Sequence, residues 1–351
     1  MHPQTSQGFG FTGASTHPAN KAVSLFRSHP YAVTSIATGA ALALTALVNY
    51  RLAKKAERDN PPIGRFVELD GVRLHFVERG EGEPLVLLHG NGSMLEDFES
   101  SGLIDMAAAE YRVIAFDRPG HGHSERPRTT IWTPETQADL IRAALVRMHV
   151  QRAIVLGHSF GCAVAIALAL KYPECVSSLV LTSGYYYPSA RLDVVALAQP
   201  AVPVVGDVIR YSVSPILSRL MWPRMTHKAF WPAGVPGKYN AFPKELAFRP
   251  SQIRASAAES ALMIPHALAA SGHYPNLKMP VIILAGAQDR LVDTDDQSAR
   301  LHADVAHSAF HRVPGVGHMV HQTVTSFVMA TIKEAAKAAR SAVAKLPQAA
   351  A

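Results

Sequence analysis

Short runs of apolar residues alternate with helical patterns through most of this chain. Runs of this kind belong to strands that are buried on both faces of a sheet. The alternation of strand and helix predicts an α/β fold, in which a mostly parallel central sheet has helices on both faces. The expected buried strands are residues 84–88, 112–116, 153–156, 179–181 and 281–284.

Local signals mark several element boundaries. Residues 66–69 and 74–77 flank Asp70-Gly71, which predicts a hairpin before the parallel strands. Thr133 is expected to cap a helix that opens at Pro134. An Ala-rich helix is expected over residues 161–171, and a long helix after His318.

The N-terminal sixty residues differ from the rest of the chain. Residues 1–30 are rich in Gly, Ser, Thr, His and Pro, and are expected to be a disordered leader. Residues 31–50 contain no charge and as a helix would span about 30 Å, the thickness of a bilayer core. A basic linker, residues 51–64, follows and contains a helix-breaking Asn-Pro-Pro. We interpret residues 31–50 as a transmembrane anchor that is no part of the catalytic fold; a cleaved signal peptide or a helix packed on the body are the alternatives.

The basic residues on either side of residues 31–50 predict the orientation. Two lie before the stretch and four lie after it, between Arg51 and Arg58. Because positive charge is retained in the cytoplasm, we expect a single-pass membrane protein with a cytoplasmic catalytic domain.

The rest of the chain divides at the interruption of the strand–helix pattern. About ninety residues, 185–275, have no clear strand pattern and carry many aromatic residues and prolines. We interpret them as a helical cap inserted into an α/β core; an unrelated second domain is disfavoured because core strands flank the segment. The core is then residues 65–184 and 276–332, followed by a basic, Ala-rich C-terminal helix or tail, residues 333–351.

The charge distribution argues against a nucleic-acid partner. The net charge of +7 comes entirely from the two ends, since residues 61–328 contain 24 bases and 24 acids. A nucleic-acid-binding protein would place its bases on one folded face. Basic ends beside an apolar segment suit the lipid of a membrane surface instead.

The sequence Gly157-His158-Ser159-Phe160-Gly161 lies between an expected strand and an expected helix. It fits G-x-S-x-G, in which a sharp turn exposes a serine nucleophile and leaves no room for side chains two residues away on either side. Ser159 is therefore the candidate nucleophile, and it needs a neighbouring base.

Four further motifs occur along the chain, and the first three of them follow expected strands. They are His89-Gly90-Asn91-Gly92, residues 117–124 (DRPGHGHS), Gly286-Ala287-Gln288-Asp289-Arg290 and Pro314-Gly315-Val316-Gly317-His318. With the serine motif, they make the chain from about residue 66 onward resemble the α/β-hydrolase superfamily. The resemblance is strongest to its serine-nucleophile, helical-cap branch of esterases, lipases and carbon–carbon bond hydrolases.

The resemblance implies the role of each matching residue. Ser159, Asp289 and His318 match the catalytic triad as nucleophile, acid and base, and the backbone N–H groups of Asn91 and Phe160 match the oxyanion hole. Asp117 is expected to order its turn. Asp293, Asp295 and Asp296 are expected to be surface or helix-start acids.

Other histidines and cofactor motifs were weighed against this assignment. His321 is the alternative base, whereas His158 is expected to pack beside the turn. The His121-x-His123 pair lacks a third ligand, so no metal is expected. No phosphate-binding glycine loop occurs, and no cofactor is expected.

The expected function is that of a cofactor-independent serine hydrolase cleaving a carboxylic ester through an acyl-enzyme on Ser159. An aromatic, apolar cap suggests a hydrophobic small-molecule substrate. The alternatives are a carbon–carbon bond hydrolase, an acyltransferase and, from another class, a non-catalytic ligand receptor.

Overall fold

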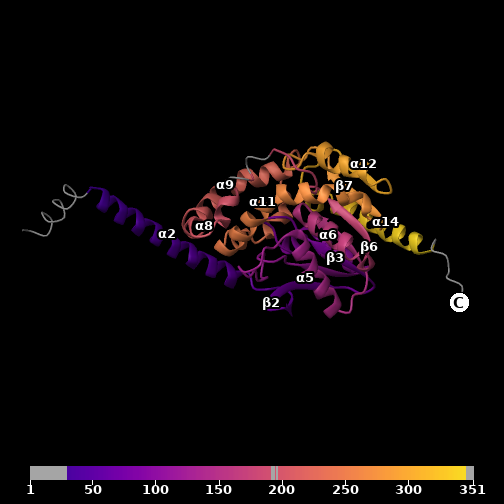
Figure 1. Ribbon diagram of the computed structural model, residues 1–351, viewed down its shortest axis with the longest axis horizontal. Coiled ribbons are helices and arrows are strands. Elements are labelled where there is room, and N and C mark those ends of the chain that lie inside the picture. Colours follow the sequence, from indigo (N-terminus) through magenta and orange to yellow (C-terminus); the bar gives the residue numbers. More distant parts are fainter. Residues whose placement is uncertain (1–29, 191–193, 195–196, 345–351) are drawn as a thin grey trace, which may run out of the picture.

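The structure, a computed structural model, describes residues 30–190, 194 and 197–344 (Figure 1). The expected leader lies outside the described residues, except for Pro30, and so do residues 345–351. The core is an α/β fold, as expected, with the long N-terminal helix projecting from it (Figure 1).

Eight strands form one central sheet in the order β1-β2-β4-β3-β5-β6-β7-β8. β2 runs antiparallel to both of its neighbours, whereas β4, β3, β5, β6, β7 and β8 are parallel to one another. The strands are β1 Arg65–Leu69, β2 Val72–Arg79, β3 Glu83–Leu88, β4 Tyr111–Phe116, β5 Ala153–His158, β6 Val176–Thr182, β7 Val281–Gly286 and β8 Ala309–Val313.

The first hairpin and the buried strands lie where the sequence predicts them. Asp70 and Gly71 have φ of 49° and 77°, the left-handed values of a two-residue hairpin turn. In β3, Leu85 and Leu87 belong to the core on one face of the sheet and Val86 and Leu88 to the core on the other. Continuous apolar strands are therefore required, because both faces are dry.

One strand was not predicted. β8 is an edge strand of sequence AFHRV, and its residues are half-buried or exposed. It has neither the continuous apolar run of a buried strand nor a clean alternation, so the sequence pattern does not reveal it.

Helices cover both faces of the sheet. α5 and α6 pack with one core, and α3, α4 and α14 pack with the other. Thr133 caps α5 by accepting a hydrogen bond from the N–H of Thr136 at 3.2 Å, as expected. The α-helices of the hydrolase core are α3 Glu96–Ser101, α4 Leu103–Ala108, α5 Pro134–Arg147, α6 Phe160–Lys171, α12 Arg300–Asp304, α13 Val320–Thr323 and α14 Thr325–Ala344.

The described part of the inserted segment contains helices and irregular stretches but no strand, and it lies over one end of the sheet (Figure 1). We call residues 185–275 the cap. Its elements are η2 Gln199–Ala201, α8 Val205–Ser212, α9 Ser214–Phe230, η3 Gly237–Ala241, α10 Lys244–Ala247, α11 Pro250–Ala270 and the start of η4 Ser271–Asn276.

The N-terminal helix corrects two expectations. α2 runs without a break over Pro30–Asp59, so residues 51–59 of the expected linker are helical. These residues are mostly strong helix formers, and Lys54 pairs with Glu57 at 2.8 Å. The C-terminal part of α2 also packs on the cap: Asn49 is 3% exposed, and its amide donates to the carbonyls of Tyr211 and Ser212 at 2.9 and 2.8 Å. The C-terminal end of the expected anchor segment is therefore packed against the cap.

The long helix expected after His318 is present, and it crosses the expected boundary between core and tail at residue 333. α14 runs continuously over Thr325–Ala344, and Ile332, Ala335 and Ala336 belong to one core beside the sheet. The basic residues lie on its other faces, which is the usual pattern of an amphipathic surface helix.

Candidate active site

Ser159 occupies the sharp turn between β5 and α6. Its backbone has φ of 53° and ψ of −120°, a conformation that a serine rarely adopts. The N–H of Ser159 donates to the carbonyl of Thr182 at 2.9 Å, which attaches the turn to β6. Strain of this kind persists where the surrounding structure demands it, and here it presents the serine hydroxyl at the carboxyl ends of the strands.

The glycines around Ser159 are required by close approach. A Cβ on Gly157 would lie 2.6 Å from the carbonyl oxygen of Gly161, and a Cβ on Gly161 would lie 2.1 Å from that of Leu88. A Cβ on Gly90 would lie 3.1 Å from the Cβ of Ser159. The loop after β3 therefore lies directly against the serine turn.

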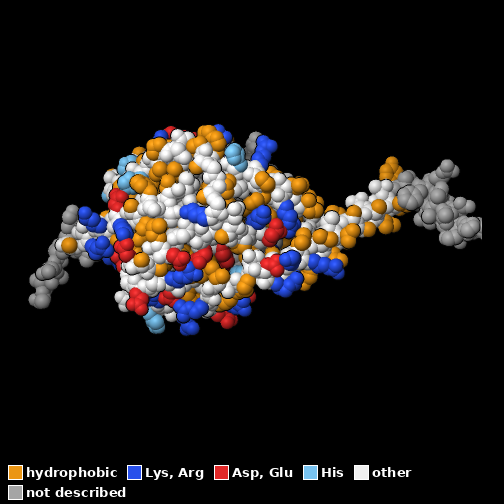
Figure 2. Space-filling model, turned by 180° about the vertical axis from the view of Figure 1, so that it is seen from behind, with side chains coloured by type: hydrophobic (Ala, Val, Ile, Leu, Met, Phe, Trp, Pro, Cys, Tyr) orange, Lys and Arg blue, Asp and Glu red, His pale blue; other side chains and the backbone are white. Residues whose placement is uncertain are grey.

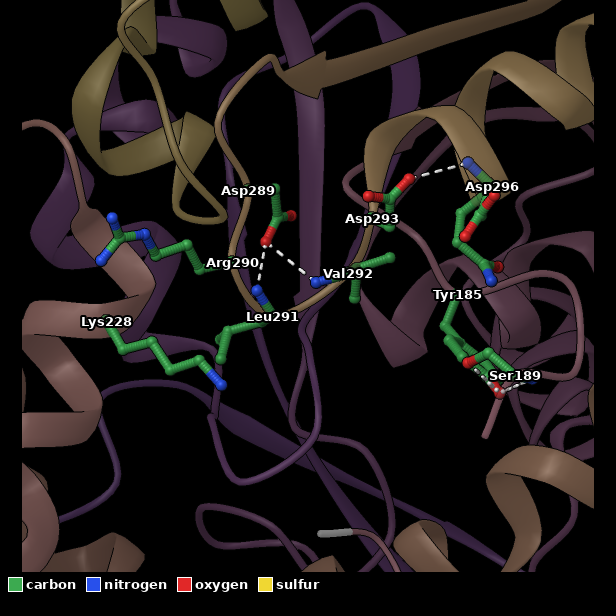
Figure 3. A pocket seen from close by; sticks show the side chains of 10 residues that line it. Tyr185, Ser189, Lys228, Asp289, Arg290, Leu291, Val292, Asp293 and Asp296 are labelled. Atoms are coloured by element: carbon green, nitrogen blue, oxygen red, sulfur yellow. Dashed lines mark hydrogen bonds between the residues drawn. The ribbon is translucent and has the colours of Figure 1, made fainter. Parts of the chain in front are cut away.

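Asp289 and His318 are in direct contact. The carboxylate oxygen Oδ2 of Asp289 lies 2.7 Å from Nδ1 of His318, and both side chains are buried, at 1% and 7% exposure. The other oxygen accepts the N–H groups of Leu291 and Val292 at 2.8 and 3.0 Å, as Figure 3 shows. Three hydrogen bonds thus hold this carboxylate facing the imidazole.

Asn91 connects the loop after β3 to the cap. Its side-chain amide donates to the carbonyl of Ser256 and the hydroxyl of Ser260, both at 3.1 Å and both on α11. Phe160, the other expected oxyanion residue, is the first residue of α6 and is 3% exposed. Its N–H belongs to the first turn of the helix, where backbone N–H groups lack a partner within the helix.

A buried polar group behind His318 was not predicted from sequence. His158 Nε2 lies 3.1 Å from the backbone carbonyl of His318, and its ring packs 4.4 Å from that of His321. His321 Nε2 lies 3.0 Å from the carboxylate of Asp97, which also accepts from Gln322 at 2.9 Å. His321, the alternative base, is therefore engaged with Asp97 and fully buried.

The electrostatics of this group agree with its burial. Burial lowers the pKa of His158 far below its usual value, so its ring is neutral. Burial alone would raise the pKa of Asp97, but the neighbouring imidazoles and the Gln322 amide lower it below the usual range. Asp97 is thus a carboxylate that holds His321.

Among the described residues, one group has a geometry that could hold a metal ion, and it consists of Asp97, His158 and His321. The candidate ligand atoms of Asp97, His158 and His321 lie within 4.8 Å of one another. Oδ1 of Asp97 lies 3.0 Å from Nε2 of His321, and all three side chains are buried. His121 and His123, weighed as a metal pair, do not belong to this group.

A buried ion pair joins the core to the cap. Arg118 donates to the carbonyls of His89 and Gly90 at 2.7 and 2.9 Å, and its guanidinium also binds Glu259 of α11 at 2.9 Å. Both side chains are fully buried. The sequence motif contains Arg118, but its partner on the cap is 141 residues away, so no local signal reveals the pair.

The acids expected to be structural have structural partners. Asp117 accepts the N–H groups of Leu95 and His123, both at 2.9 Å, and contacts His75 Nδ1 at 2.7 Å. Asp293 accepts the N–H groups of Asp295 and Asp296 at 2.9 Å and caps the helical turn that follows. Both findings fit the roles expected from the sequence.

Comparison with known proteins places this arrangement in a family. Residues 83–323 match the family described as alpha/beta hydrolase fold. The chain belongs to this family. It is a hydrolase of the alpha/beta fold, and the resemblance inferred from the motifs is confirmed.

Individual relatives of this alpha/beta hydrolase differ in activity. A 2-hydroxymuconate semialdehyde hydrolase of Pseudomonas sp. (strain CF600) is 34% identical over 136 residues, 38% of this chain and 48% of that protein. The match thus spans about half the length of that relative. Among solved structures, an esterase from Thermogutta terrifontis superposes with a TM-score of 0.65 at 21% identity, covering 79% of this chain and 99% of the esterase.

A third match extends into the N-terminal helix. A membrane phospholipase A superposes with a TM-score of 0.61 at 20% identity, and covers 91% of this chain and 98% of its own. Residues 65–351 make up less than 91% of the chain, so the superposition includes part of the segment before β1. The similarity in fold therefore reaches beyond the hydrolase core.

A pocket of about 570 Å³ opens beside the Asp289 loop of this alpha/beta hydrolase (Figure 3). Lys228 and Arg290 line it together with Asp289, Asp293 and Asp296. The pocket lies on the acid side of the Asp289–His318 contact, and Ser159 is not among its lining residues. It is mixed in charge, unlike the dry, mostly apolar pockets that hold hydrophobic ligands.

Proposed function

We propose that this hydrolase cleaves a hydrophobic carboxylic ester through an acyl-enzyme on Ser159. The observation that carries the proposal is the combination of a serine at a strained strand-to-helix turn with a buried carboxylate–imidazole contact of 2.7 Å. A serine hydroxyl is a poor nucleophile until a positioned base takes its proton. His318 is that base, and Asp289 is its partner.

In the acylation step, the Ser159 hydroxyl oxygen bonds to the ester carbonyl carbon while its proton moves to Nε2 of His318. Nε2 is the nitrogen that remains for this role, because Nδ1 faces Asp289. Asp289 keeps the imidazole in that tautomer and stabilises the imidazolium. The carbonyl oxygen becomes an oxyanion, which accepts from the N–H groups of Asn91 and Phe160; one such donor is worth about 3 kcal/mol in the transition state.

The tetrahedral intermediate then breaks its bond to the alcohol oxygen, which takes the proton from His318 as it leaves. A water molecule enters, gives a proton to His318 and attacks the acyl carbon. The bond to Ser159 breaks, the serine recovers its proton, and the carboxylic acid departs. These steps involve only proton transfer and the making and breaking of carbon–oxygen bonds, with no net oxidation or reduction, so they require no redox cofactor.

Labelling by a fluorophosphonate probe tests the nucleophile. We expect the probe to attach to Ser159 in the wild-type protein and not in Ser159→Ala. Labelling that persists in Ser159→Ala would place the nucleophile elsewhere, and no labelling of a folded wild type would support a non-catalytic receptor.

The second candidate is a carbon–carbon bond hydrolase, favoured by the 34% identity to a 2-hydroxymuconate semialdehyde hydrolase. A panel of esters of graded acyl length, compared with a vinylogous 1,5-diketone, separates the two activities. We expect ester turnover to be the faster and to rise with acyl length. Faster diketone cleavage would assign the second activity, and transfer of the acyl group to an added alcohol would indicate an acyltransferase.

We also propose that α2 anchors the enzyme in a membrane in a single pass, with the hydrolase in the cytoplasm. α2 is long and apolar enough to span a bilayer by length and composition, and its apolar window is not buried in the fold. Burial in lipid is not screened by salt, whereas adsorption of basic ends is. The full-length protein is expected to stay with membranes in high salt; its release would mean peripheral attachment.

A further inference from the structure

Large apolar side chains cover the outer side of the cap. Val204 and Leu220 are 74% and 73% exposed. Val205, Val208, Leu217 and Met221 are each about half exposed. We call these six residues, on α8, α9 and the turn before them, the apolar cap face. Where exposed apolar side chains form a contiguous patch, they mark an interaction site in a folded protein.

α2 packs against α8, which carries part of the apolar cap face. Asn49 is hydrogen-bonded to the end of α8, and Arg219 of α9 donates to its side-chain oxygen at 3.4 Å. The residues just before Asn49 are exposed, with Leu44 at 63% and Leu47 at 47%. α2 leaves the body beside α8 and α9, and hydrophobic side chains cover its outer part (Figures 1 and 2). The medium that surrounds the outer part of α2 therefore also contacts the cap near the end of α8.

The charges around the apolar cap face favour a lipid surface. Asp207 is the one acidic residue between positions 197 and 244 of the sequence. It is neutralised by Arg128, at 3.2 Å, and by Arg210. Arg224 and Arg51 are exposed. An apolar face whose one acidic residue nearby in the sequence is paired, and which has exposed basic residues beside it, suits the headgroup region of a bilayer that contains anionic lipid.

We propose that the apolar cap face rests in the surface of the same bilayer that holds α2, so that substrate passes from the lipid into the active site. This inference depends on the membrane anchor proposed above. α9 provides the connection: it begins in the apolar cap face, and at its other end the carbonyl of Ala229 accepts the N–H of His318 at 2.9 Å. A Cβ on Gly317 would lie 2.2 Å from the carbonyl oxygen of Trp231. One helix thus joins the lipid-facing surface to the loop that carries the proposed base.

This arrangement has a consequence for substrate class. An ester of long acyl chains partitions into the bilayer, and its soluble concentration is low. A cap that lies in the bilayer surface would admit such a substrate without a transfer through bulk water. The proposed hydrophobic ester is then a lipid or a lipid-soluble molecule, taken up along α9.

Fluorescent labels on single introduced cysteines test where the surface lies. The native Cys162 and Cys175 are fully buried, so an exposed cysteine is the one that a polarity-sensitive probe modifies. The full-length protein carries the probe at Val204→Cys or Leu220→Cys and is placed in nanodiscs of phosphatidylcholine and phosphatidylglycerol. Bromine on the acyl chains quenches a probe only where it touches lipid.

Two control positions complete the experiment. Leu44→Cys lies on the proposed span. Val146→Cys, 53% exposed, lies near the end of α5, which precedes β5, and hence toward the N-terminal ends of the parallel strands, whereas the serine turn follows the C-terminal end of β5. We expect quenching at Leu44, Val204 and Leu220 and none at Val146.

The outcomes separate the two proposals. Quenching at Leu44 without quenching at Val204 and Leu220 would overturn the lipid-facing cap and leave the anchor intact. No quenching at Leu44 would overturn the anchor and the cap proposal together. Cap probes that are shielded from water yet not quenched by bromolipid would show that protein, such as a second copy of the chain, covers the face.

Turnover provides a second, independent readout. Leu220→Glu should lower the hydrolysis of a long-chain ester embedded in the bilayer by about tenfold, because a carboxylate is expelled from the lipid surface. Hydrolysis of a short, water-soluble acetate should stay within about twofold of wild type, since Leu220 is exposed and is not among the residues proposed to act on the ester. The matched control Val146→Glu should change neither. An unchanged long-chain rate in Leu220→Glu would contradict uptake from the bilayer.

Discussion

At the scale of single residues, the contact between Asp289 and His318 distinguishes the proposed base from other histidines. His318 has its backbone carbonyl 3.1 Å from His158 Nε2 and its Nδ1 2.7 Å from Asp289. His321, three residues further on, faces Asp97 instead. The two histidines therefore have different partners, and substitution should separate their roles.

We predict that His318→Ala and Asp289→Asn each lower kcat for ester hydrolysis by about 10³-fold or more, because proton transfer in the transition state is lost. Adding Ser159→Ala to either variant should lower the rate little further, since residues that act as a unit are not additive. Steady-state rates with a short ester measure this.

His321→Gln is the matched control for that prediction. It should retain far more activity than His318→Ala, and its main effect should be a lower melting temperature. An inactive His321→Gln beside an active His318→Ala would reverse the assignment of the base.

The buried histidines predict how stability changes with pH. Burial lowers the pKa of His89 to about 3, and lowers the pKa of His121 and His158 well below the usual value. The unfolded chain therefore binds more protons than the folded chain below about pH 6.5. Stability from these groups is present above that pH and is lost as the pH falls; for His89, with its pKa of about 3, the loss at pH 5 is about 2 kcal/mol.

Glu96 has the opposite effect on the stability of the protein. Burial raises its pKa to about 8, so its contribution to stability increases as the pH falls. Three histidines outweigh one carboxyl, so the melting temperature in detergent should fall between pH 7 and pH 5. Asp97 adds nothing in this window, because its pKa lies below the usual range and its contribution is lost only under more acidic conditions. A melting temperature that is flat or rises toward pH 5 would contradict the neutral state of these histidines.

At the scale of secondary-structure elements, the junction of β5, α6 and β3 limits what can replace the serine-turn glycines. Gly161 lies so close to β3 that a Cβ would sit 2.1 Å from the carbonyl oxygen of Leu88. The neighbour is backbone in the middle of the fold, so neither side can move cheaply.

We predict that Gly161→Ala lowers the free energy of unfolding by about 3 kcal/mol or more and abolishes fluorophosphonate labelling, because α6 must shift away from β3. Gly272→Ala, where a Cβ would meet nothing within 4 Å, is the matched control and should melt as the wild type does. Melting curves and probe labelling of the two variants test this. Equal melting temperatures would mean that the turn is less tightly packed than the distance indicates.

At the scale of the whole molecule, α2 has two parts with different roles. Its outer part is exposed, whereas Asn49, Ala56 and Glu57 contact the cap or the residues next to it. Ala56 packs with Met94 and Leu246, and Glu57 pairs with Arg249 at 3.3 Å. A truncation should therefore be placed before Asn49, not at the Pro-Pro break.

We predict that a chain beginning at residue 48 hydrolyses short esters like the full-length protein. A chain beginning at residue 61 should be less stable by about 2–4 kcal/mol, because the carbonyls of Tyr211 and Ser212 lose the Asn49 amide and the Ala56 contacts are removed. Thermal unfolding of the two chains makes the comparison. Equal stability would show that the inner part of α2 contributes nothing to the fold.

The sequence by itself determined the fold class, most of the strands and the candidate chemistry of this hydrolase. Buried parallel strands have to be continuously apolar, and the serine turn has to have glycine at positions 157 and 161, so both leave local patterns. The edge strand β8 left none, because half-exposed strands obey weaker rules. The helical state of residues 51–59 was obscured by their charge, which suggested a linker although the residues themselves favour helix.

Only the tertiary structure decided which distant residues meet. Glu259 is an ordinary helix residue until α11 brings it to Arg118, and Asp97 is an ordinary acid until it faces His321. The same holds for Asn49, which lies in an apolar stretch and yet is buried against the end of α8. Such contacts join segments more than a hundred residues apart, and no period or motif in the chain encodes them. They depend on how helices pack on the sheet and on one another, which is a property of the whole fold.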